Sequence, residues 1–314
     1  MSTNFSASGA VGRTDAGYFI PELWSDEVLA VYKANLVFPQ LVTVLDFHNQ
    51  KGDLIHVPRP SRGSASSKAN ETQVTIIAES NTVFDLTIDQ HYEYSRFIED
   101  LAKIQAMDSM RAFYTDDAGY ALAIQVDTAL SALGAGFAAS ASTPTTAGTA
   151  FDEAVIGSDG STQWTDQASG NGASLTDAGI RRVIQYLDAS NVPARDRALV
   201  VSEVEKRKLL GLPRFTEQAF VGDGASIRNG QIGNVYGVPV YVTTNGPTDD
   251  ANDSTTYDMC LLFQKEAIIF AEQQAPRSQT QYKQEFLADL LTVDQVYGKG
   301  LMRPEAGVAI AVPQ

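Results

Sequence analysis

The spacing of apolar residues predicts one helix that is much longer than any other element of the chain. From Leu101 onward, apolar side chains recur at intervals of three and four residues, which places them on one helical face. Proline is absent from residues 98–133, and Gly119 is the single weak point for a helix there. At about 1.5 Å per residue this helix would span roughly 54 Å, longer than a small domain is wide. Its apolar stripe consists of Leu101, Ile104, Met107, Met110, Phe113, Tyr114, Leu122, Val126, Leu130 and Leu133.

The segment before this helix, residues 49–95, is extended and polar. Phe84, Leu86 and Ile88 alternate with polar residues, which is the period of a half-buried strand. Residues 61–70 are small and polar and form the expected tip of this arm. Because a lone hairpin is only marginally stable in water, the arm is expected to dock on another surface. Together, the arm and the long helix favour a chain that lies across its neighbours.

Shorter segments complete an α+β pattern with several buried strands. Residues 134–172 contain few large apolar side chains and are expected to form a long surface excursion. Residues 1–17 are rich in small polar residues and are expected to be ordered only against a partner. The spacing predicts helices over 21–33, 174–189 (with Ser174 as the N-cap) and 203–210, and strands over 41–45, 54–57, 73–78, 83–89, 198–202, 238–242, 259–264, 267–271 and 308–312.

The charge balance restricts the kinds of partner. The chain has 314 residues and is 44% hydrophobic, enough to bury a real core. Lys and Arg total 23 against 38 Asp and Glu, which gives a net charge of -15. Non-specific nucleic-acid binding needs a concentrated basic face, so the acidic balance argues against it. The same charge fits high solubility and mutual repulsion between subunits before assembly.

The cysteine count and the hydropathy profile indicate a protein made in a reducing compartment. Cys260 is the only cysteine, and it lies in the apolar run 259–263, which predicts a buried small side chain and not a reactive thiol. The first residues show no basic region followed by an apolar one, so no signal peptide is expected. No apolar stretch approaches about 18 residues, so no membrane span is expected either.

Catalytic and metal-binding patterns are missing from the sequence. His48, His56 and His91 have no cysteine or second histidine at metal-ligand spacing. The glycines between 222 and 237 match neither phosphate-binding fingerprint. The chain contains no Gly-x-Ser-x-Gly nucleophile elbow. Asp249, Asp250 and Asp253 lack the glycine and glutamate of an EF-hand and are expected to form a solvated turn. Glu203 and Glu205 begin a predicted helix, where carboxylates are stabilised by the helix dipole. We therefore expect no catalytic residue, cofactor or metal, and no enzyme activity.

Four short motifs, taken in order, resemble those of a known family. They are residues 19–24 (FIPELW), 35–40 (NLVFPQ), 233–242 (GNVYGVPVYV) and 300–306 (GLMRPEA). With the succession of arm, long helix and central domain, they make the chain similar to the major capsid proteins of tailed bacteriophages with the Hong Kong 97-type fold. The resemblance covers nearly the whole chain.

The resemblance implies the Hong Kong 97-type capsid fold, an α+β architecture with four parts. These would be an N-terminal arm (1–35), an extended E-loop hairpin (49–95), a central A-domain (174–283), and a peripheral P-domain (36–48, 96–173 and 284–314) that contains the spine helix 98–133 and an insertion at 134–172.

The resemblance also implies a structural function. Copies of the subunit would assemble into hexamers and pentamers of an icosahedral shell around double-stranded DNA, which they would not bind sequence-specifically. The E-loop would lie over an adjacent subunit. Because the segment before the arm is short, a separate scaffolding protein is expected, together with a portal protein and a cement protein. The mature location would be the virion, after synthesis and assembly in the host cytoplasm.

Six residues are the candidate intersubunit contacts under this hypothesis. They are Trp24, Arg59, Arg62, Lys68, Phe84 and Leu86. Some family members also cross-link lysine to asparagine between subunits, for which Lys68, Asn70 and Lys103 are the candidates here, but no acid-lined pocket for a lysine is evident in the sequence.

Two alternatives stay open at the level of sequence. An encapsulin, a cellular nanocompartment with the same fold, would carry an enzyme cargo and not DNA. An acidic hydrolase with a long lid would elute as a monomer and turn over a generic ester.

Overall fold

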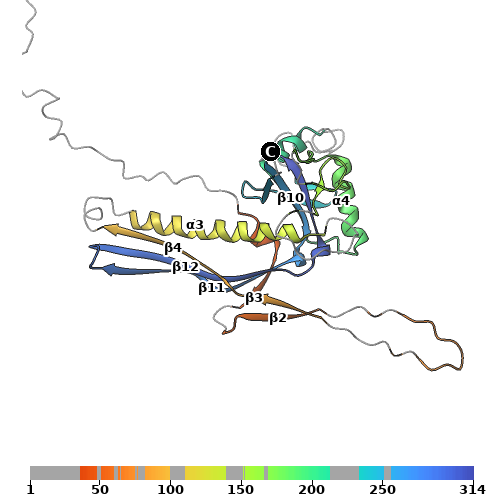
Figure 1. Ribbon diagram of the computed structural model, residues 1–314, viewed down its shortest axis with the longest axis horizontal. Coiled ribbons are helices and arrows are strands. Elements are labelled where there is room, and N and C mark those ends of the chain that lie inside the picture. Colours follow the sequence, from red (N-terminus) through yellow and green to blue (C-terminus); the bar gives the residue numbers. More distant parts are fainter. Residues whose placement is uncertain are drawn as a thin grey trace, which may run out of the picture.

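Three sheets organise the described part of the chain (Figure 1). One sheet has four strands, one has seven, and one is a two-stranded hairpin. The computed structural model describes residues 36–47, 51–59, 63, 65–74, 76, 82–99, 110–138, 151, 153–165, 169–212, 233–250 and 256–314.

The four-stranded sheet is built around one long hairpin. Its order is β1 (Thr43–Asp46), β11 (Ile268–Lys283), β12 (Ala288–Leu301) and β4 (Gln90–Glu99). β12 is antiparallel to both of its neighbours, and β1 runs parallel to β11. Helix α3 (Met110–Ser131) lies along this sheet (Figure 1). Ala118 and Leu122 of α3 pack with Val293 of β12 in a small apolar cluster, which fixes the helix to the sheet.

The seven-stranded sheet forms the second large body. Strand β10 lies in its middle and is buried over most of its length. Its order is β5 (Val155–Ile156), β13 (Gly307–Pro313), β10 (Thr256–Gln264), β6 (Arg197–Val201), β8 (Val238–Val242) and β7 (Asn234–Val235), with β9 (Thr248–Asp250) also on β10. Helices α4 (Asp177–Ala189) and α5 (Glu203–Leu210) belong to this body, and Ile180, Val183 and Leu187 form the buried stripe of α4, with Ile184 partly buried beside them.

The third sheet is the base of the arm. β2 (Leu54–Arg59) pairs antiparallel with β3 (Thr82–Thr87), and the chain beyond them runs away from both larger sheets (Figure 1). The predicted alternation in β3 is confirmed, because Leu86 is buried and Phe84 half-buried while Asp85 and Thr87 are exposed.

A buried carboxylate joins the start of the described chain to the long helix. Asp127 of α3 is fully buried, and its Oδ1 accepts hydrogen bonds from the backbone N–H groups of Val37 (3.2 Å) and Phe38 (3.0 Å). Its Oδ2 accepts one from the Asn245 amide at 3.1 Å. The carboxylate therefore caps the short helix α1 (Phe38–Leu41), whose own N-cap residue makes no side-chain bond. Burial raises the pKa of Asp127, although these hydrogen bonds act in the opposite direction.

The prediction of one helix over 98–133 is wrong at both described ends. Residues 98 and 99 belong to strand β4, and the helix ends at Ser131, followed by a 3-10 turn over Ala132–Gly136. Residues 100–109 lie outside the described part. The cause is tertiary, because β12 supplies hydrogen-bond partners for the whole of β4, and Tyr92 and Tyr94 turn toward the Leu122 cluster with period two.

Two other expectations also differ from the structure. Residues 151–165, expected on the surface, include Trp164 and Phe151 in the main core, and β5 adds a strand to the large sheet. Helix α4 begins at Asp177, and its cap is Thr176 and not Ser174, since the Thr176 hydroxyl accepts from the Gly179 N–H. The two large sheets exchange strands along the chain, because β11 lies in the four-stranded sheet while β13 lies in the seven-stranded one.

The first testable prediction concerns the packing of α3 on the four-stranded sheet. Leu122→Asp places a charge at a position that is 4% exposed and surrounded by apolar side chains. We expect it to lower the free energy of unfolding by more than about 3 kcal/mol. Ala132→Asp, at an exposed position just after the helix, is the control and should change little. Equal chemical denaturation curves for both variants would contradict the assigned helix face.

The second prediction concerns the pH dependence conferred by Asp127. Its folded pKa lies above the ordinary value of 3.8, so the folded chain keeps a proton that the unfolded chain has lost. The contribution of Asp127 to stability is therefore largest below pH 3.8 and falls as the pH rises through the folded pKa. Asp127→Asn removes the carboxyl group and with it this pH dependence. The difference in unfolding free energy between the wild type and Asp127→Asn should decline over that window in urea titrations, and a constant difference would refute the prediction.

Candidate functional site

The base of the arm packs on its own chain. Leu86 is 1% exposed and lies in a cluster with Ile269 and Ala271 of β11, while Phe84 packs at the edge of that cluster. Leu86 was expected to contact another subunit, and this is wrong, because its surface is already covered within its own chain. Its alternation identified a buried face, but sequence gives no sign of which surface covers it. Phe84 is only half-buried and stays a candidate contact.

Arg59 connects the arm to the end of the four-stranded sheet. Its Nη2 lies 3.4 Å from Oε1 of Glu305, and both side chains are partly exposed. Glu305 belongs to the turn at residues 303–306, between β12 and β13, that the family motif had identified. The contact is thus intrachain, and it leaves part of the Arg59 side chain accessible.

The outer part of the arm exposes both charge and apolar surface. Lys68 is exposed, while Arg62 and Trp24 lie outside the described residues. Val74, Ile76 and Val83 are 63%, 86% and 59% exposed, values unusual for aliphatic side chains. An extension that carries exposed β-branched residues away from the body is suited to lying on another surface.

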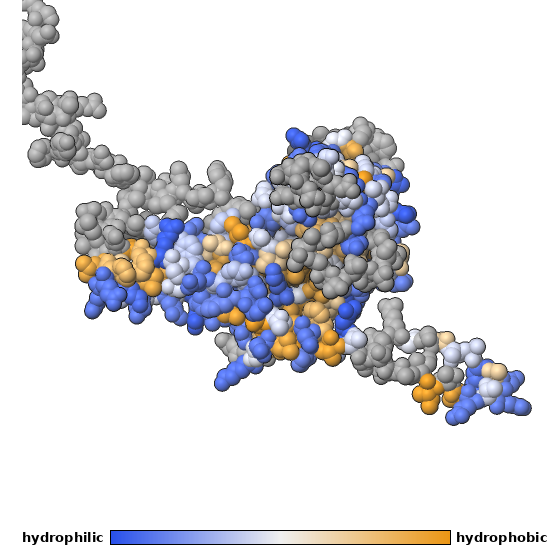
Figure 2. Space-filling model, in the orientation of Figure 1, coloured by the Kyte–Doolittle hydropathy of each residue, from blue (hydrophilic) through white to orange (hydrophobic). Residues whose placement is uncertain are grey.

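A second apolar surface lies at the far end of the four-stranded sheet, where sequence analysis had not identified one. It consists of Phe97, Tyr282, Phe286 and Leu287, from the end of β4 and the β11–β12 turn, and we call it the apolar tip. The rings of Phe97 and Phe286 lie 5.2 Å apart, and Leu287 adopts a positive φ of 46°. Figure 2 shows apolar side chains at this end of the molecule. Such an exposed cluster is typical of an interaction surface.

The titratable groups singled out in the sequence serve structural roles where they are described. His56 bonds Asp85 on the neighbouring strand at 2.6 Å, and His91 lies 3.5 Å from Asp294. Glu205 is fully buried and accepts from the Leu175 N–H (2.8 Å) and the Lys208 ammonium (2.7 Å). His48 and Asp253 lie outside the described part of the chain. Among the described residues, no group of three or more metal-ligating side chains comes together.

Cys260 is an inert core residue. It is fully buried in β10, as its apolar run predicted, and burial raises the pKa of its thiol far above the usual value. Within the described residues, no helix is both long enough and apolar enough to cross a membrane.

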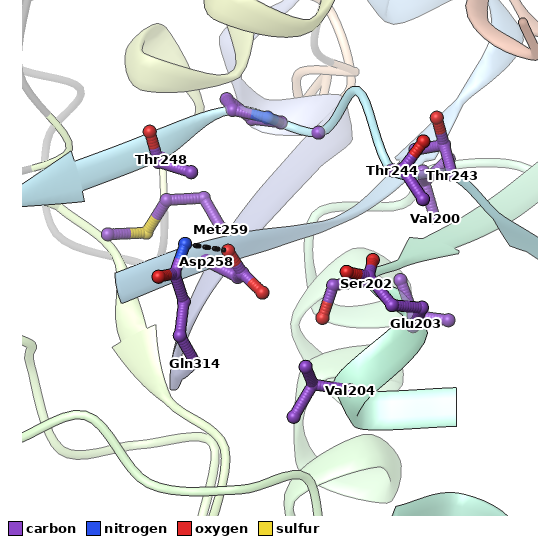
Figure 3. Close-up of a pocket in the computed structure, with 13 residues that line it drawn as sticks. Val200, Ser202, Glu203, Val204, Thr243, Thr244, Thr248, Asp258, Met259 and Gln314 are labelled. Carbon is purple, nitrogen blue, oxygen red and sulfur yellow. Dashed lines mark hydrogen bonds between the residues drawn. The ribbon is translucent and has the colours of Figure 1, made fainter. Parts of the chain in front are cut away.

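The best-defined cavity lies at one end of the seven-stranded sheet (Figure 3). Its volume is about 260 Å³, slightly below the usual range for ligand pockets. Its walls are the end of β6, the start of α5, the loop before β9 and the C-terminal Gln314. Several of its polar groups are engaged in the fold, since Asp258 accepts from Gln314 at 2.9 Å and Ser202 caps α5. No histidine, cysteine or lysine is among its lining residues, and its ionisable side chains are the carboxylates of Glu203 and Asp258.

The geometry describes a shell subunit: two sheet bodies, a helix along one of them, an outstretched hairpin, and polar groups engaged in the fold. The chain matches a family model for phage capsid protein over residues 42–312, which is most of its length, and it therefore belongs to the phage capsid protein family. The fold is the Hong Kong 97-type capsid fold, as expected.

Solved structures give the same result. The chain is similar to a protein of Mycobacterium phage Che8, with 25% identity, a TM-score of 0.70, and coverage of 93% of this chain and 97% of that one. The capsid of cyanophage P-SCSP1u matches with 20% identity, a TM-score of 0.74 and 99% of each chain. The capsid of a native GTA particle matches with 14% identity, a TM-score of 0.64, and 98% and 100% coverage. A comparison with curated proteins gives no match.

The chain is therefore a major capsid protein that forms an icosahedral shell, and its place is the virion. The family match favours this structural role over the nanocompartment shell and the hydrolase.

Proposed function

We propose that the subunit assembles into hexamers and pentamers through its outstretched arm, which lies over an adjacent copy. The single observation that carries this proposal is the exposure of Val74, Ile76 and Val83 on a segment that runs away from its own body. Burial of such side chains on a neighbour removes apolar surface from water. Lys68 and the accessible part of Arg59 add positive charge to the arm of a chain whose net charge is -15, so the rest of another copy attracts it.

The apolar tip forms a second contact between copies in this proposal. The tip lies at the opposite end of the four-stranded sheet from the seven-stranded body (Figure 1). Both signs of charge border it, with Arg96 and Lys283 on one hand and Glu285 and Asp289 on the other. A balanced rim lets each charge meet its opposite on a second copy, and this favours a contact between identical subunits over one with a uniformly acidic or basic partner.

The observed sheets support a revised division of the chain. The E-loop corresponds to the β2–β3 hairpin and the segment between its strands. The P-domain corresponds to the four-stranded sheet with α3, and the A-domain to the seven-stranded sheet with α4 and α5. The N-terminal arm, residues 1–35, stays a proposal from sequence.

The remaining partners rest on the family. We propose that a separate scaffolding protein and a portal protein take part in assembly in the host cytoplasm, and that a cement protein binds the outer surface. Packaged double-stranded DNA lies inside without sequence-specific contacts, which fits the acidic charge of the chain.

The third prediction tests the arm. Deletion of residues 61–70 removes the expected tip but leaves both sheet bodies and their cores intact. The variant should be soluble, with an unchanged melting temperature, and should form few shells in electron micrographs. The control replaces the same ten residues with a glycine–serine segment of equal length, which separates the need for reach from the need for sequence. A normal yield of shells from the deletion would refute the role of the arm.

The fourth prediction tests the apolar tip. Phe286 is 62% exposed, so Phe286→Asp should leave the melting temperature of the free subunit within about 2 °C of the wild type. The added charge must be desolvated in a contact between copies, so the yield of shells should fall at least about tenfold. Ser278→Asp adds the same charge at an exposed position on β11, away from the apolar tip, and is the matched control. Equal loss of assembly in both variants would attribute the effect to net charge and contradict the proposal.

A further inference from the structure

Two glycines of β12 lie directly beneath the base of the arm. Gly298 and Gly300 are two residues apart on one strand, so both face the same side of the sheet. A Cβ atom at Gly298 would lie 2.7 Å from the carbonyl oxygen of Thr87. A Cβ atom at Gly300 would lie 2.8 Å from both Leu86 Cδ1 and Phe84 Cζ. At Gly298 no side chain fits unless the backbone of the hairpin shifts, and at Gly300 none fits unless the side chains of Leu86 and Phe84 move.

The need for glycine here comes from packing and not from the backbone. Five described glycines have positive φ angles, and neither Gly298 nor Gly300 is among them. Alanine could therefore adopt the backbone conformation of either residue. What excludes it is the close approach of strand β3, which crosses this face of β12.

The neighbouring residues of β12 point to the other face. Tyr297 packs against Tyr92 and Phe270, and Lys299 donates to the Ala129 carbonyl of α3 at 3.0 Å. The long helix thus covers one face of the strand while the hairpin covers the other. Because β12 is held by α3 and by its two neighbouring strands, it provides a rigid support for the hairpin.

Few other contacts fasten the hairpin to the body. Leu86 forms a small buried cluster with Ile269 and Ala271, and partly buried side chains surround that cluster, among them Ile55, Val57 and Phe84 of the hairpin. The Gln273 amide donates to the Gly52 carbonyl at 2.9 Å. The pair Arg59–Glu305 is partly exposed, and such pairs contribute little. Over Gly298 and Gly300 the hairpin lies so close to β12 that an added Cβ atom would meet it at under 3 Å.

A small rotation at the base of the hairpin produces a large displacement at the far end of the arm. Ten residues of extended chain beyond the base reach roughly 33 Å at about 3.3 Å per residue. A tilt of about 10° at the base would move the far end by roughly 6 Å, by the same geometry. That displacement exceeds the tolerance of any packed interface, where surfaces must meet within about 1 Å.

We infer that Gly298 and Gly300 are positioning residues that set the angle at which the arm leaves the subunit and thereby decide whether it reaches the adjacent copy. This inference rests on the proposed function of the arm. The two positions are not equivalent. At Gly300 the obstacle is the far end of two side chains, which can turn aside, whereas at Gly298 it is a backbone carbonyl, which cannot. Gly298→Ala therefore has the larger effect.

The experiment compares Gly298→Ala and Gly300→Ala with Gly63→Ala. Gly63 lies on the outer part of the arm with no atom within 4 Å of an added Cβ, so it controls for the gain of a methyl group. Spin labels on Lys68→Cys and Ser278→Cys, both exposed, report the distance from the arm to the body in the free subunit. The native Cys260 is fully buried and does not react with the label. Shells are scored by electron microscopy.

We expect the label-to-label distance to shift by several ångströms in Gly298→Ala, less in Gly300→Ala, and not at all in Gly63→Ala. Shell yield should fall in the same order, with melting temperatures that show a folded body. Unchanged label-to-label distances in both Gly298→Ala and Gly300→Ala would overturn the inference, whether or not shells form. A shifted distance with a normal yield of shells would support the role of the two glycines in setting the angle of the arm, and would overturn the role of the arm in assembly. If Gly298→Ala gives no soluble subunit, Gly300→Ala decides the question alone.

Discussion

The architecture depends on one strand that is covered from both sides. Along β12, Tyr297 and Lys299 face the long helix, while Gly298 and Gly300 face the arm. The period of two in a strand makes this division automatic, and it lets one strand fix two elements in opposite directions. The same strand continues through the turn at 303–306 into β13, which lies beside the central strand of the second sheet. The positions of the helix, the arm and the seven-stranded body are thus all fixed relative to β12.

Local signals explain which elements could be predicted. Helix α5 has the predicted bounds of Glu203 and Leu210, because Ser202 caps one end and Gly211 follows the other. The tight turn before β8 is also local, since Tyr236 and Gly237 have positive φ angles and join β7 directly to β8. In both cases the residues that decide the structure are close in sequence. The order of elements and the four motifs likewise sufficed for the family, which the family model confirms.

Contacts between distant residues explain what could not be predicted. β11 extends to Lys283 although its outer half is polar and exposed, because β12 supplies its partners along the whole length. The start of the long helix was placed too early, since Phe97 and Ile98 suit a helix as well as a strand. Leu86 was assigned to the correct kind of face but to the wrong partner. The two glycines of β12 carried no sign of their role, because what they accommodate lies about two hundred residues earlier in the chain.

The strength of the contacts differs between the parts of the subunit in a way that suits a shell. The seven-stranded sheet carries an extensive apolar core on each face, one of which it shares with α3 and the four-stranded sheet. At the base of the arm, by contrast, only Leu86, Ile269 and Ala271 are fully buried. The ion pairs near that base are partly exposed and contribute at most about 1 kcal/mol each. Attraction therefore holds the arm weakly. Close packing over glycine, by contrast, limits its direction through repulsion, which is steep over a few tenths of an ångström. In the proposed assembly, a weak attraction with a steep steric limit would keep the arm of a free subunit aimed at its neighbour and would still let it adapt when copies meet it at different angles. This combination is what a single chain needs when it must occupy many positions in one curved shell.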